Sequence, residues 1–371
     1  KVQTKQIACP EFLLLKCRQF HFLINIQNLI NILNKIFLSS PILKPFPENY
    51  VRAKNGFNIL MNSKGILLAL STVLVWAILN VVNRFCILNY DTNVMVFTAF
   101  MIFSTGISLM LIRQRVTTGN WKSGVKYSWL YTIMQIIRSF TMISTFLYIT
   151  STETSLLFNI EIIITYILAY AFFRRVPYKG DYLGILIILT GFILFIFTLP
   201  EHQRTIVSIL ILISATASCI RSIVVEETTI WSPETTVRQK CGISGYTMFY
   251  GGLYLVLFFY GIALFRFFFD ASFPPPLNFL HYLPSLGEML HPETVISACI
   301  AGFFINACTT FLYYTTLKYS TSETFMAVRV FQPVMTYLFE IIAALYYTAM
   351  RPGLTKQDYI LGGIIIIGSL L

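Results

Sequence analysis

Long apolar stretches separated by short polar pieces run from about residue 65 to the end of the chain. Polar, turn-forming sequences such as "RRVPYKGD" and "RPGLTKQD" lie between them. A helix needs roughly 20 apolar residues to cross a bilayer. The pattern therefore predicts an all-α polytopic membrane protein with ten transmembrane helices. The ten expected spans are 65–86, 94–112, 127–149, 154–173, 182–199, 205–225, 243–267, 295–317, 324–347 and 357–371.

A polar phrase that occurs twice divides the ten spans into two sets of five. "FLYITSTET" begins at Phe146 and "FLYYTTLKYSTSET" begins at Phe311, and both lead into a long apolar stretch. A Thr-Tyr pair then follows in each set, at Thr165 and at Thr336. Because each set has an odd number of spans, the second set must enter the membrane from the opposite face. We therefore expect two inverted five-helix repeats, an architecture of secondary transporters.

This division gives the expected domain organisation. The first repeat covers residues 61–199, and the second covers residues 205–371 with its last helix truncated. Residues 1–60 are rich in Asn and Ile and have no clear signal-peptide pattern. We interpret them as an extension outside the core, disordered or spurious. An amphipathic helix at the membrane interface is the alternative interpretation.

The Lys and Arg residues of the loops predict the orientation in the membrane. The loops after spans 2, 4, 6 and 8 carry ten of them, whereas the loops after spans 1, 3, 5, 7 and 9 carry three. Cytoplasmic loops of membrane proteins are enriched in positive residues. We therefore expect a multi-pass protein of the plasma membrane (the inner membrane of a bacterium), with both ends of the core in the cytoplasm.

Composition agrees with a membrane protein and excludes several other classes. Hydrophobic residues make up 56% of the chain and charged residues 12%, whereas soluble domains are about a quarter charged. The net charge of +11 comes without the basic clusters of a nucleic-acid surface. Scattered Cys and His residues give no metal site, and neither a phosphate-binding loop nor a catalytic cluster is visible. We expect no enzyme, cofactor, metal or nucleic-acid partner, and a monomer or homodimer in the bilayer.

The ninth span carries four polar side chains on one helix face: Arg329, Gln332, Thr336 and Glu340. Charges at mid-depth in a membrane are costly, so they usually face a cavity or a charged partner. We interpret this face as part of a polar substrate-binding site. An internal Arg–Glu pair that only orients helices is the alternative.

Polar residues on other spans extend this candidate site. Glu161 and Thr165 in the fourth span are the repeat equivalents of the middle two residues of the ninth-span face. We expect the two faces to oppose each other across a central cavity. Asn80 in the first span is a candidate hydrogen-bond donor to the substrate. Arg138, near the middle of the third span, either binds an anionic substrate group or neutralises Glu161.

Two further arginines are candidate gates. Arg84 ends the first span toward the outer face, where it is either a gate or an interfacial anchor. Arg221 lies nearer the cytoplasmic end of the sixth span, where a long side chain can also reach the interface or form a structural ion pair. Glu161 and Glu340 are the candidates for proton coupling.

Three features resemble the drug/metabolite transporter superfamily, EamA type. The first span reads "VWAILNVVNRF", in which Trp76, Asn80 and Arg84 are similar to the family's Trp-small, Asn and basic pattern. Both third spans end in Leu-Tyr-x-Thr and turn into the fourth span of their repeat. "VFQPVMTYLFE" resembles the family's fourth span centred on Glu-Pro-Val, here with Pro333. Ile162 stands at the equivalent place in the first half, so the sequence does not predict a matched kink.

The resemblance covers about residues 61–371 and implies a permease that works by exchange, facilitated diffusion or proton coupling. Our hypothesis is a secondary transporter that moves a small polar metabolite by alternating access, coupled to a proton or exchanged for a counter-substrate. The arginines favour an amino acid or another zwitterion that bears a carboxylate. An exporter of cationic or amphiphilic drugs is the nearest alternative. A non-transporting membrane enzyme or scaffold is the second.

Overall fold

The computed structural model describes residues 63–90, 92–113, 118–173, 181–231, 236–269, 283–320 and 322–370. The expected extension, residues 1–60, lies outside this part of the chain. Asn62–Leu371 form one compact unit. The described residues form helices and turns and no strand, which confirms the all-α class.

Each of the ten expected spans coincides with one helix or with an interrupted helix. Helix α12 (Leu286–Met289) and the short 3-10 turn η4 (Thr348–Met350) lie in connections. The first half contains α4 (Ser63–Tyr90), α5 (Val94–Leu111), α6 (Thr118–Thr145), α7 (Ser151–Leu157), α8 (Ile160–Phe173) and α9 (Asp181–Thr198). The second half contains α10 (Glu201–Trp231), α11 (Val237–Phe269), α13 (Pro292–Ile300), the π-helical turn η3 (Ala301–Asn306), α14 (Ala307–Tyr319), α15 (Ser322–Arg329), α16 (Gln332–Tyr346) and α17 (Lys356–Leu370).

Eight of these segments are long and apolar enough to cross a membrane. α6 and α17 are the two expected spans outside this set. α6 is less apolar because it contains Gln135, Arg138 and several hydroxyl side chains, and α17 has only 15 described residues. The structure thus confirms a polytopic helical protein, and the inverted ten-helix arrangement stays a prediction.

The fourth and ninth spans are both interrupted, at equivalent points of the two repeats. α15 ends at Arg329 and α16 begins at Gln332. Pro333 lies in the first turn of α16, where a missing N–H leaves no hydrogen bond unmade. α7 ends at Leu157 and α8 begins at Ile160, without any proline. The sequence gives no basis for a kink in the first half, and the structure shows a break there.

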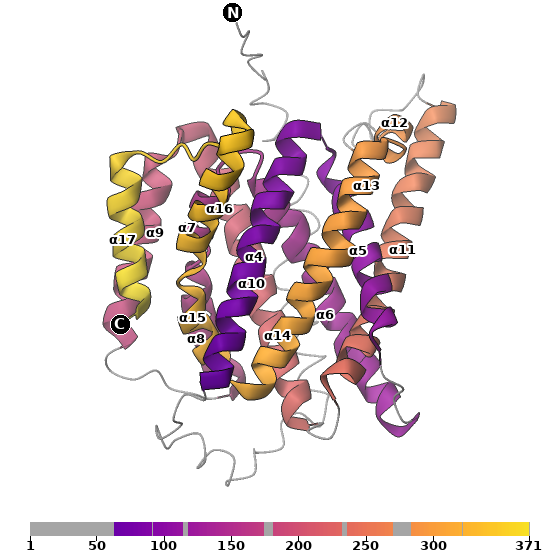
Figure 1. The fold of residues 1–371 in the computed structure, drawn as a ribbon, viewed down its shortest axis with the longest axis horizontal. Coiled ribbons are helices and arrows are strands. Elements are labelled where there is room, and N and C mark those ends of the chain that lie inside the picture. Colours follow the sequence, from indigo (N-terminus) through magenta and orange to yellow (C-terminus); the bar gives the residue numbers. More distant parts are fainter. Residues whose placement is uncertain are drawn as a thin grey trace, which may run out of the picture. The chain divides into compact units, whose positions relative to one another are not determined.

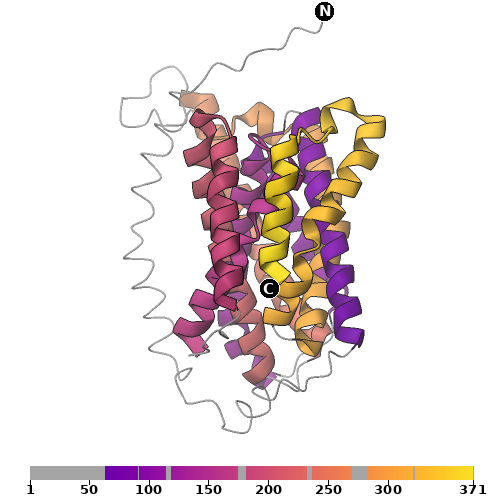
Figure 2. The same cartoon turned by 90° about the vertical axis from the view of Figure 1, so that its left-hand side faces the viewer.

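Helices of the two halves lie side by side throughout the unit. α5 lies along α11, α6 along α10, and α9 along α17 (Figures 1 and 2). Figure 1 shows α7 above α8 and α16 above α15, so the two interrupted spans run in opposite directions. The two copies of the repeated phrase therefore lead into helices at opposite ends of the bundle.

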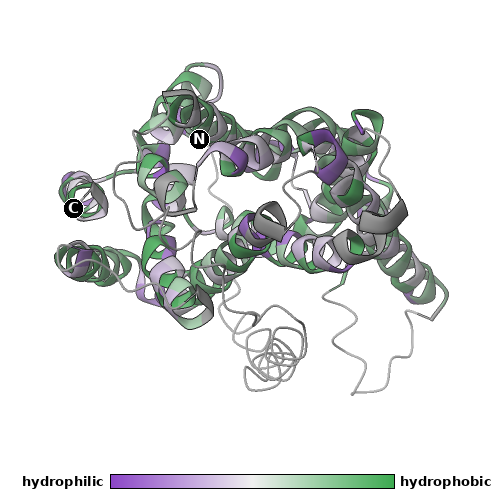
Figure 3. Cartoon of the chain, turned by 90° about the horizontal axis from the view of Figure 1, so that it is seen from below, coloured by the Kyte–Doolittle hydropathy of each residue, from purple (hydrophilic) through white to green (hydrophobic). Residues whose placement is uncertain are grey.

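Apolar side chains cover the outside of the unit, and many polar ones are inside. Figure 3 shows hydrophobic residues along the outer sides of the helices. Phe268, Leu345 and Tyr346 are each more than 70% exposed. In contrast, the Thr132 and Thr247 hydroxyls meet at 2.8 Å in the interior, between α6 and α11. This inversion of the soluble pattern indicates that lipid covers the outer sides.

α5 and α11 approach each other so closely that glycine is required at the contact. A Cβ atom on Gly252 would lie 2.4 Å from the backbone nitrogen of Phe103. A Cβ atom on Gly106 would lie 2.3 Å from the backbone nitrogen of Phe249. Small residues allow such backbone contact between helices in membranes.

This contact predicts a difference between two glycines of the same helix. Gly252→Ala should destabilise the protein by about 1–3 kcal/mol, because the methyl group must displace backbone. Gly261→Ala is the matched control, since nothing lies within 4 Å of its Cβ position. Thermal unfolding in detergent measures both variants. Equal melting temperatures would contradict the close approach of α5 and α11.

Candidate functional site

The two helix breaks meet through a buried ion pair. Arg329, at the end of α15, donates from Nη1 to Oε2 of Glu161 in the first turn of α8. Arg329 Nε also donates to Gln332 Oε1 at 2.8 Å. Both members of the pair are at least 95% buried. A charge this deep is stable only when it is paired, so the contact ties the first half to the second.

Several polar atoms around this pair have no hydrogen-bond partner among the described residues. They are Glu161 Oε1, Arg329 Nη2, Gln332 Nε2 and Asn159 Nδ2. Unsatisfied polar atoms in a buried site need an explanation, such as a ligand, an ion or water. The ion pair therefore leaves hydrogen-bonding capacity on both partners.

A small cavity lies beside the pair. It is large enough for roughly one water molecule, so a metabolite does not fit in this conformation. The cavity takes residues from α7, α8, α15 and α16 and from the first-half break. Its lining is Ser155, Phe158, Asn159, Glu161, Ile162, Met326, Arg329 and Gln332.

Three guanidinium groups surround one indole ring next to this cavity. The Cζ atoms of Arg329, Arg138 and Arg221 lie 4.7, 5.1 and 5.4 Å from the ring centroid of Trp76. All three arginines are at least 95% buried. Cations are attracted to the face of an indole, more strongly where water is excluded. We call Trp76 and these three arginines the Trp76 cluster.

Arg221 does not reach an interface, in contrast to one expectation from its position. Its side chain is 2% exposed and donates from Nη1 to Oε1 of Gln135 on α6. Its guanidinium also lies over the rings of Tyr313 and Tyr131, at 5.0 and 5.7 Å from their centroids. Arg221 is thus part of the interior polar cluster and does not snorkel to the membrane surface.

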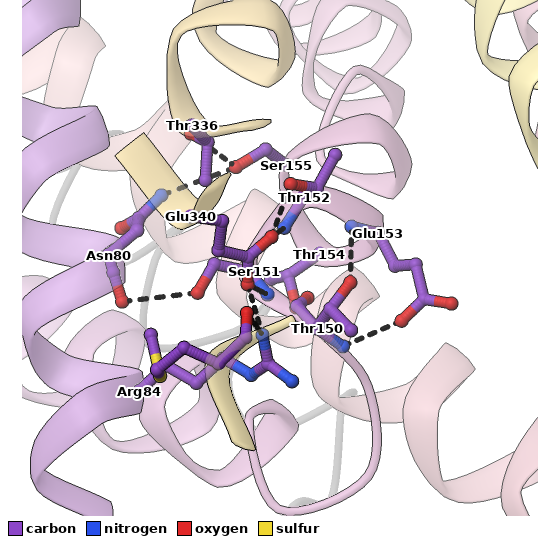
Figure 4. Close-up of polar contacts among 11 residues, drawn as sticks. Asn80, Arg84, Thr150, Ser151, Thr152, Glu153, Thr154, Ser155, Thr336 and Glu340 are labelled. Carbon is purple, nitrogen blue, oxygen red and sulfur yellow. Dashed lines mark hydrogen bonds and ion pairs between the residues drawn. The ribbon is translucent and has the colours of Figure 1, made fainter. Parts of the chain in front are cut away.

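A second buried carboxylate lies toward the end of the bundle where α7 begins. Figure 4 shows Glu340 of α16 at the N-terminus of α7, beside Arg84 of α4. Glu340 accepts hydrogen bonds from the backbone N–H groups of Ser151 and Thr152, at 2.9 and 3.2 Å. The Thr152 hydroxyl and Arg84 Nη1 also donate to it. We call this arrangement the Glu340 latch.

The electrostatics of the latch favour a structural role in this conformation. The N-terminus of a helix carries unpaired N–H groups and partial positive charge, which a carboxylate satisfies. Arg84 adds a full charge and also donates to the carbonyl oxygen of Met350 at 3.3 Å. Both carboxylate oxygens of Glu340 have partners, whereas Glu161 has a partner for Oε2 but none for Oε1 among the described residues. The latch connects α4, α7 and α16, and so joins the two halves.

Small hydroxyl and amide groups connect the latch to the cavity. Asn80 Nδ2 donates to Ser155 Oγ at 3.4 Å, and the Ser155 and Thr336 hydroxyls are 3.2 Å apart. Thr336 also donates to the carbonyl oxygen of Gln332 at 2.9 Å. Thr165 does not join this group, because its hydroxyl is 3.2 Å from Cys219 Sγ on α10. The expected opposition of Thr165 and Thr336 across a cavity is therefore not found.

Sequence reasoning missed Phe158 and Asn159, which line the cavity from the break between α7 and α8. No proline or glycine marks this break, so no local signal could have found them. It also read the Ser151-Thr152 pair only as part of a polar turn. Their backbone N–H groups bind Glu340, and backbone groups leave no trace in a side-chain pattern.

Fold and site together define a polytopic membrane protein with a buried, charged interior. Residues 63–197 match the model of the EamA-like transporter family. Over this segment the chain is similar to EamA-like transporters, in agreement with the resemblance to the drug/metabolite transporter superfamily. Proteins of this family transport small molecules across membranes.

Other comparisons add little to this identification. No curated protein matches the sequence. One solved structure, titled "Crystal structure of protein", is 13% identical and has a TM-score of 0.49. The alignment covers 83% of this chain and 95% of that chain. We base no argument on a likeness at this level.

The latch predicts strong coupling between Arg84 and Glu340. Arg84→Met or Glu340→Gln alone should cost about 3–5 kcal/mol, because each leaves a buried group without its partner. The double variant should lose clearly less than the sum of the two single losses. Thermal unfolding in detergent measures all three variants.

Glu153→Gln is the matched control for this series. Glu153 lies in the same turn of α7, and its carboxylate accepts a hydrogen bond from the Thr150 N–H in a capping box, a role that Gln also fills. We expect it to change stability little. Additive losses for Arg84 and Glu340 would show that the latch contributes no coupling.

Proposed function

We propose that the protein is a secondary transporter that moves a small metabolite with an anionic group across the plasma membrane by alternating access. The observation that carries this proposal is the Glu161–Arg329 pair, which lies at the two helix breaks beside the cavity. Interrupted helices form the substrate sites of many transporters, because their ends expose backbone and side-chain groups away from lipid. Amino acids and related carboxylates are the substrate class with which we start.

The helix contacts support two halves related by a two-fold axis. α4 packs on α14 and α16, and the equivalent helix of the second half, α10, packs on α6 and α8. The interrupted spans run in opposite directions, as inverted repeats require (Figure 1). Such halves can exchange roles, so that an outward-facing and an inward-facing state have similar energies.

The charge of the interior argues against a cationic drug as the main substrate. Arg138, Arg221 and Arg329 outnumber Glu161, the one acidic residue that touches the Trp76 cluster among the described residues. A cation placed here would meet like charges where little water screens them. A substrate that brings negative charge instead gains charge-assisted hydrogen bonds to guanidinium groups.

Transport by purified protein in liposomes tests the proposal. The solutes are amino acids, mono- and dicarboxylates, phosphate esters, neutral sugars and quaternary ammonium cations, each assayed by counterflow. We expect flux of at least one anionic class, and a loss of about tenfold or more in Glu161→Gln and Arg329→Gln, because removing a buried charge partner costs several kcal/mol.

Tyr170→Phe is the matched control, since Tyr170 lies on α8 with Glu161 but is 60% exposed on the outer surface. It should transport like the unmodified protein. Normal flux in both pair variants would remove the pair from the site. If no solute shows gradient-driven or counterflow uptake, the transporter proposal itself is wrong.

Cysteine labelling tests the proposed orientation. Glu201 begins α10 and Lys318 lies in the last turn of α14; both are exposed, at opposite ends of the bundle. In a background without native cysteines, a membrane-impermeant maleimide added to intact cells should label Glu201→Cys and spare Lys318→Cys. Lysed cells provide the control, in which both should react. The reverse pattern in intact cells would contradict the positive-inside assignment.

A further inference from the structure

The Trp76 cluster holds more positive charge than its protein partners balance. Arg329 has the carboxylate of Glu161, and Arg221 has the neutral amide oxygen of Gln135. The Arg138 guanidinium lies over the rings of Trp76 and Phe158, and the carboxylate of Glu161, which is already paired with Arg329, also acts on its charge. Three guanidinium groups and one carboxylate leave two positive charges without an acidic partner in the cluster.

The hydrogen-bonding state of the cluster leads to the same conclusion. Four guanidinium nitrogens are buried and have no acceptor among the described residues. They are Arg138 Nε, Arg221 Nε, Arg221 Nη2 and Arg329 Nη2. Interior polar groups in proteins are nearly always paired, and a charged group left unpaired in a membrane interior is especially costly. An indole face attracts the positive charge of a guanidinium group. It does not accept hydrogen bonds from the N–H groups, which therefore still need acceptors.

The arginines also differ in what else they touch. Arg138 and Arg329 share a second ring, that of Phe158, at 5.8 and 5.2 Å from its centroid. Arg221 contacts Tyr313 and Tyr131 instead. The positive charges thus form two groups by their contacts, Arg138 with Arg329 and Arg221 alone, and all three contact Trp76. Of the three arginines, Arg329 lines the cavity. An anion with two negative charges matches this arrangement better than one with a single charge.

We propose that the Trp76 cluster binds a compact dianion, either a short dicarboxylate or a phosphate monoester. This inference rests on the proposed transport function and narrows its substrate class. Either group accepts paired hydrogen bonds from guanidinium forks. A zwitterion such as a neutral amino acid brings no net charge and leaves the excess unbalanced. In the described conformation, all three guanidinium groups contact the ring of Trp76. The dianion would balance the charge of these same groups when it binds.

Matched ligands test the charge requirement. Counterflow and ligand-induced thermal stabilisation are measured at pH 7.5 with the C3 to C6 dicarboxylates, each beside its monoamide, and with glycerol 3-phosphate beside glycerol. We expect at least one dianion to act at a concentration tenfold or more below that of its matched partner. The dicarboxylate and phosphate arms show which of the two chemistries the site takes.

Arg138→Gln tests the role of the least compensated charge. Removing it leaves a single excess charge, so the preference for a dianion over its monoamide should fall at least fivefold. The ligand-free variant should melt at the same temperature as the unmodified protein or higher, since a buried unpaired charge has been removed. A purely structural arginine would give the opposite, a lower melting temperature with an unchanged preference.

Two further variants make this test robust. Arg221→Gln should also reduce the preference for a dianion over its monoamide, because it removes another charge of the cluster. This variant replaces Arg138→Gln in the test if Arg138→Gln does not fold. Arg204→Gln is the matched control, because Arg204 binds the carbonyl oxygens of Leu199 and Phe197 at the start of α10, outside the cluster. The Arg204→Gln variant should keep the same preference for a dianion over its monoamide as the unmodified protein.

The outcomes separate this inference from the proposed function. If monoamides or zwitterions act as well as dianions, the dianion inference is wrong although transport stands. An unchanged preference in both Arg138→Gln and Arg221→Gln also overturns it. If no solute of the wider panel is transported or stabilises the protein, the proposed function fails together with the inference.

Discussion

The Glu161–Arg329 ion pair is the interaction on which the arrangement of the two halves depends. Each residue lies at a helix break, and the pair joins the two breaks through side chains of opposite charge. One carboxylate oxygen and one guanidinium nitrogen of the pair have no hydrogen-bond partner among the described residues. A paired contact that keeps unused hydrogen-bonding groups can stabilise this conformation and still bind a ligand.

The two buried glutamates differ in a way that their sequence positions do not show. Glu340 has its oxygens occupied by Arg84, by two backbone N–H groups and by a hydroxyl, whereas Glu161 has a free oxygen beside a cavity. Both were equal candidates for substrate contact and proton coupling. Hydrogen-bond saturation separates them: the saturated carboxylate of Glu340 stabilises one conformation, whereas Glu161 keeps an oxygen that can accept a further hydrogen bond.

Sequence periodicity predicted much of the framework, because lipid imposes a simple rule on span length and on the cost of buried charge. The all-helical polytopic class and eight of the expected spans follow from that rule. The nearness of Arg329 and Gln332 was also expected, although they lie on two helices rather than on one continuous face. The break before Ile160 was not expected, since it depends on tertiary contacts and not on proline. The common contact of three arginines with Trp76 was not expected either, because their spans are far apart in sequence.

In the alternating-access cycle that we propose, these two sites have linked roles. The latch holds α7 against α16 (Figure 4). The Glu161–Arg329 pair lies further along the same two interrupted spans, at the ends of α8 and α15 that face the breaks. A dianion that binds the Trp76 cluster competes with Glu161 for Arg329, because one guanidinium fork cannot hold two carboxylates equally well. In that cycle, weakening the pair frees α15 and α8 to move. Helix α16 carries both Gln332, which binds Arg329, and Glu340 of the latch, so we expect it to link substrate binding to opening of the latch.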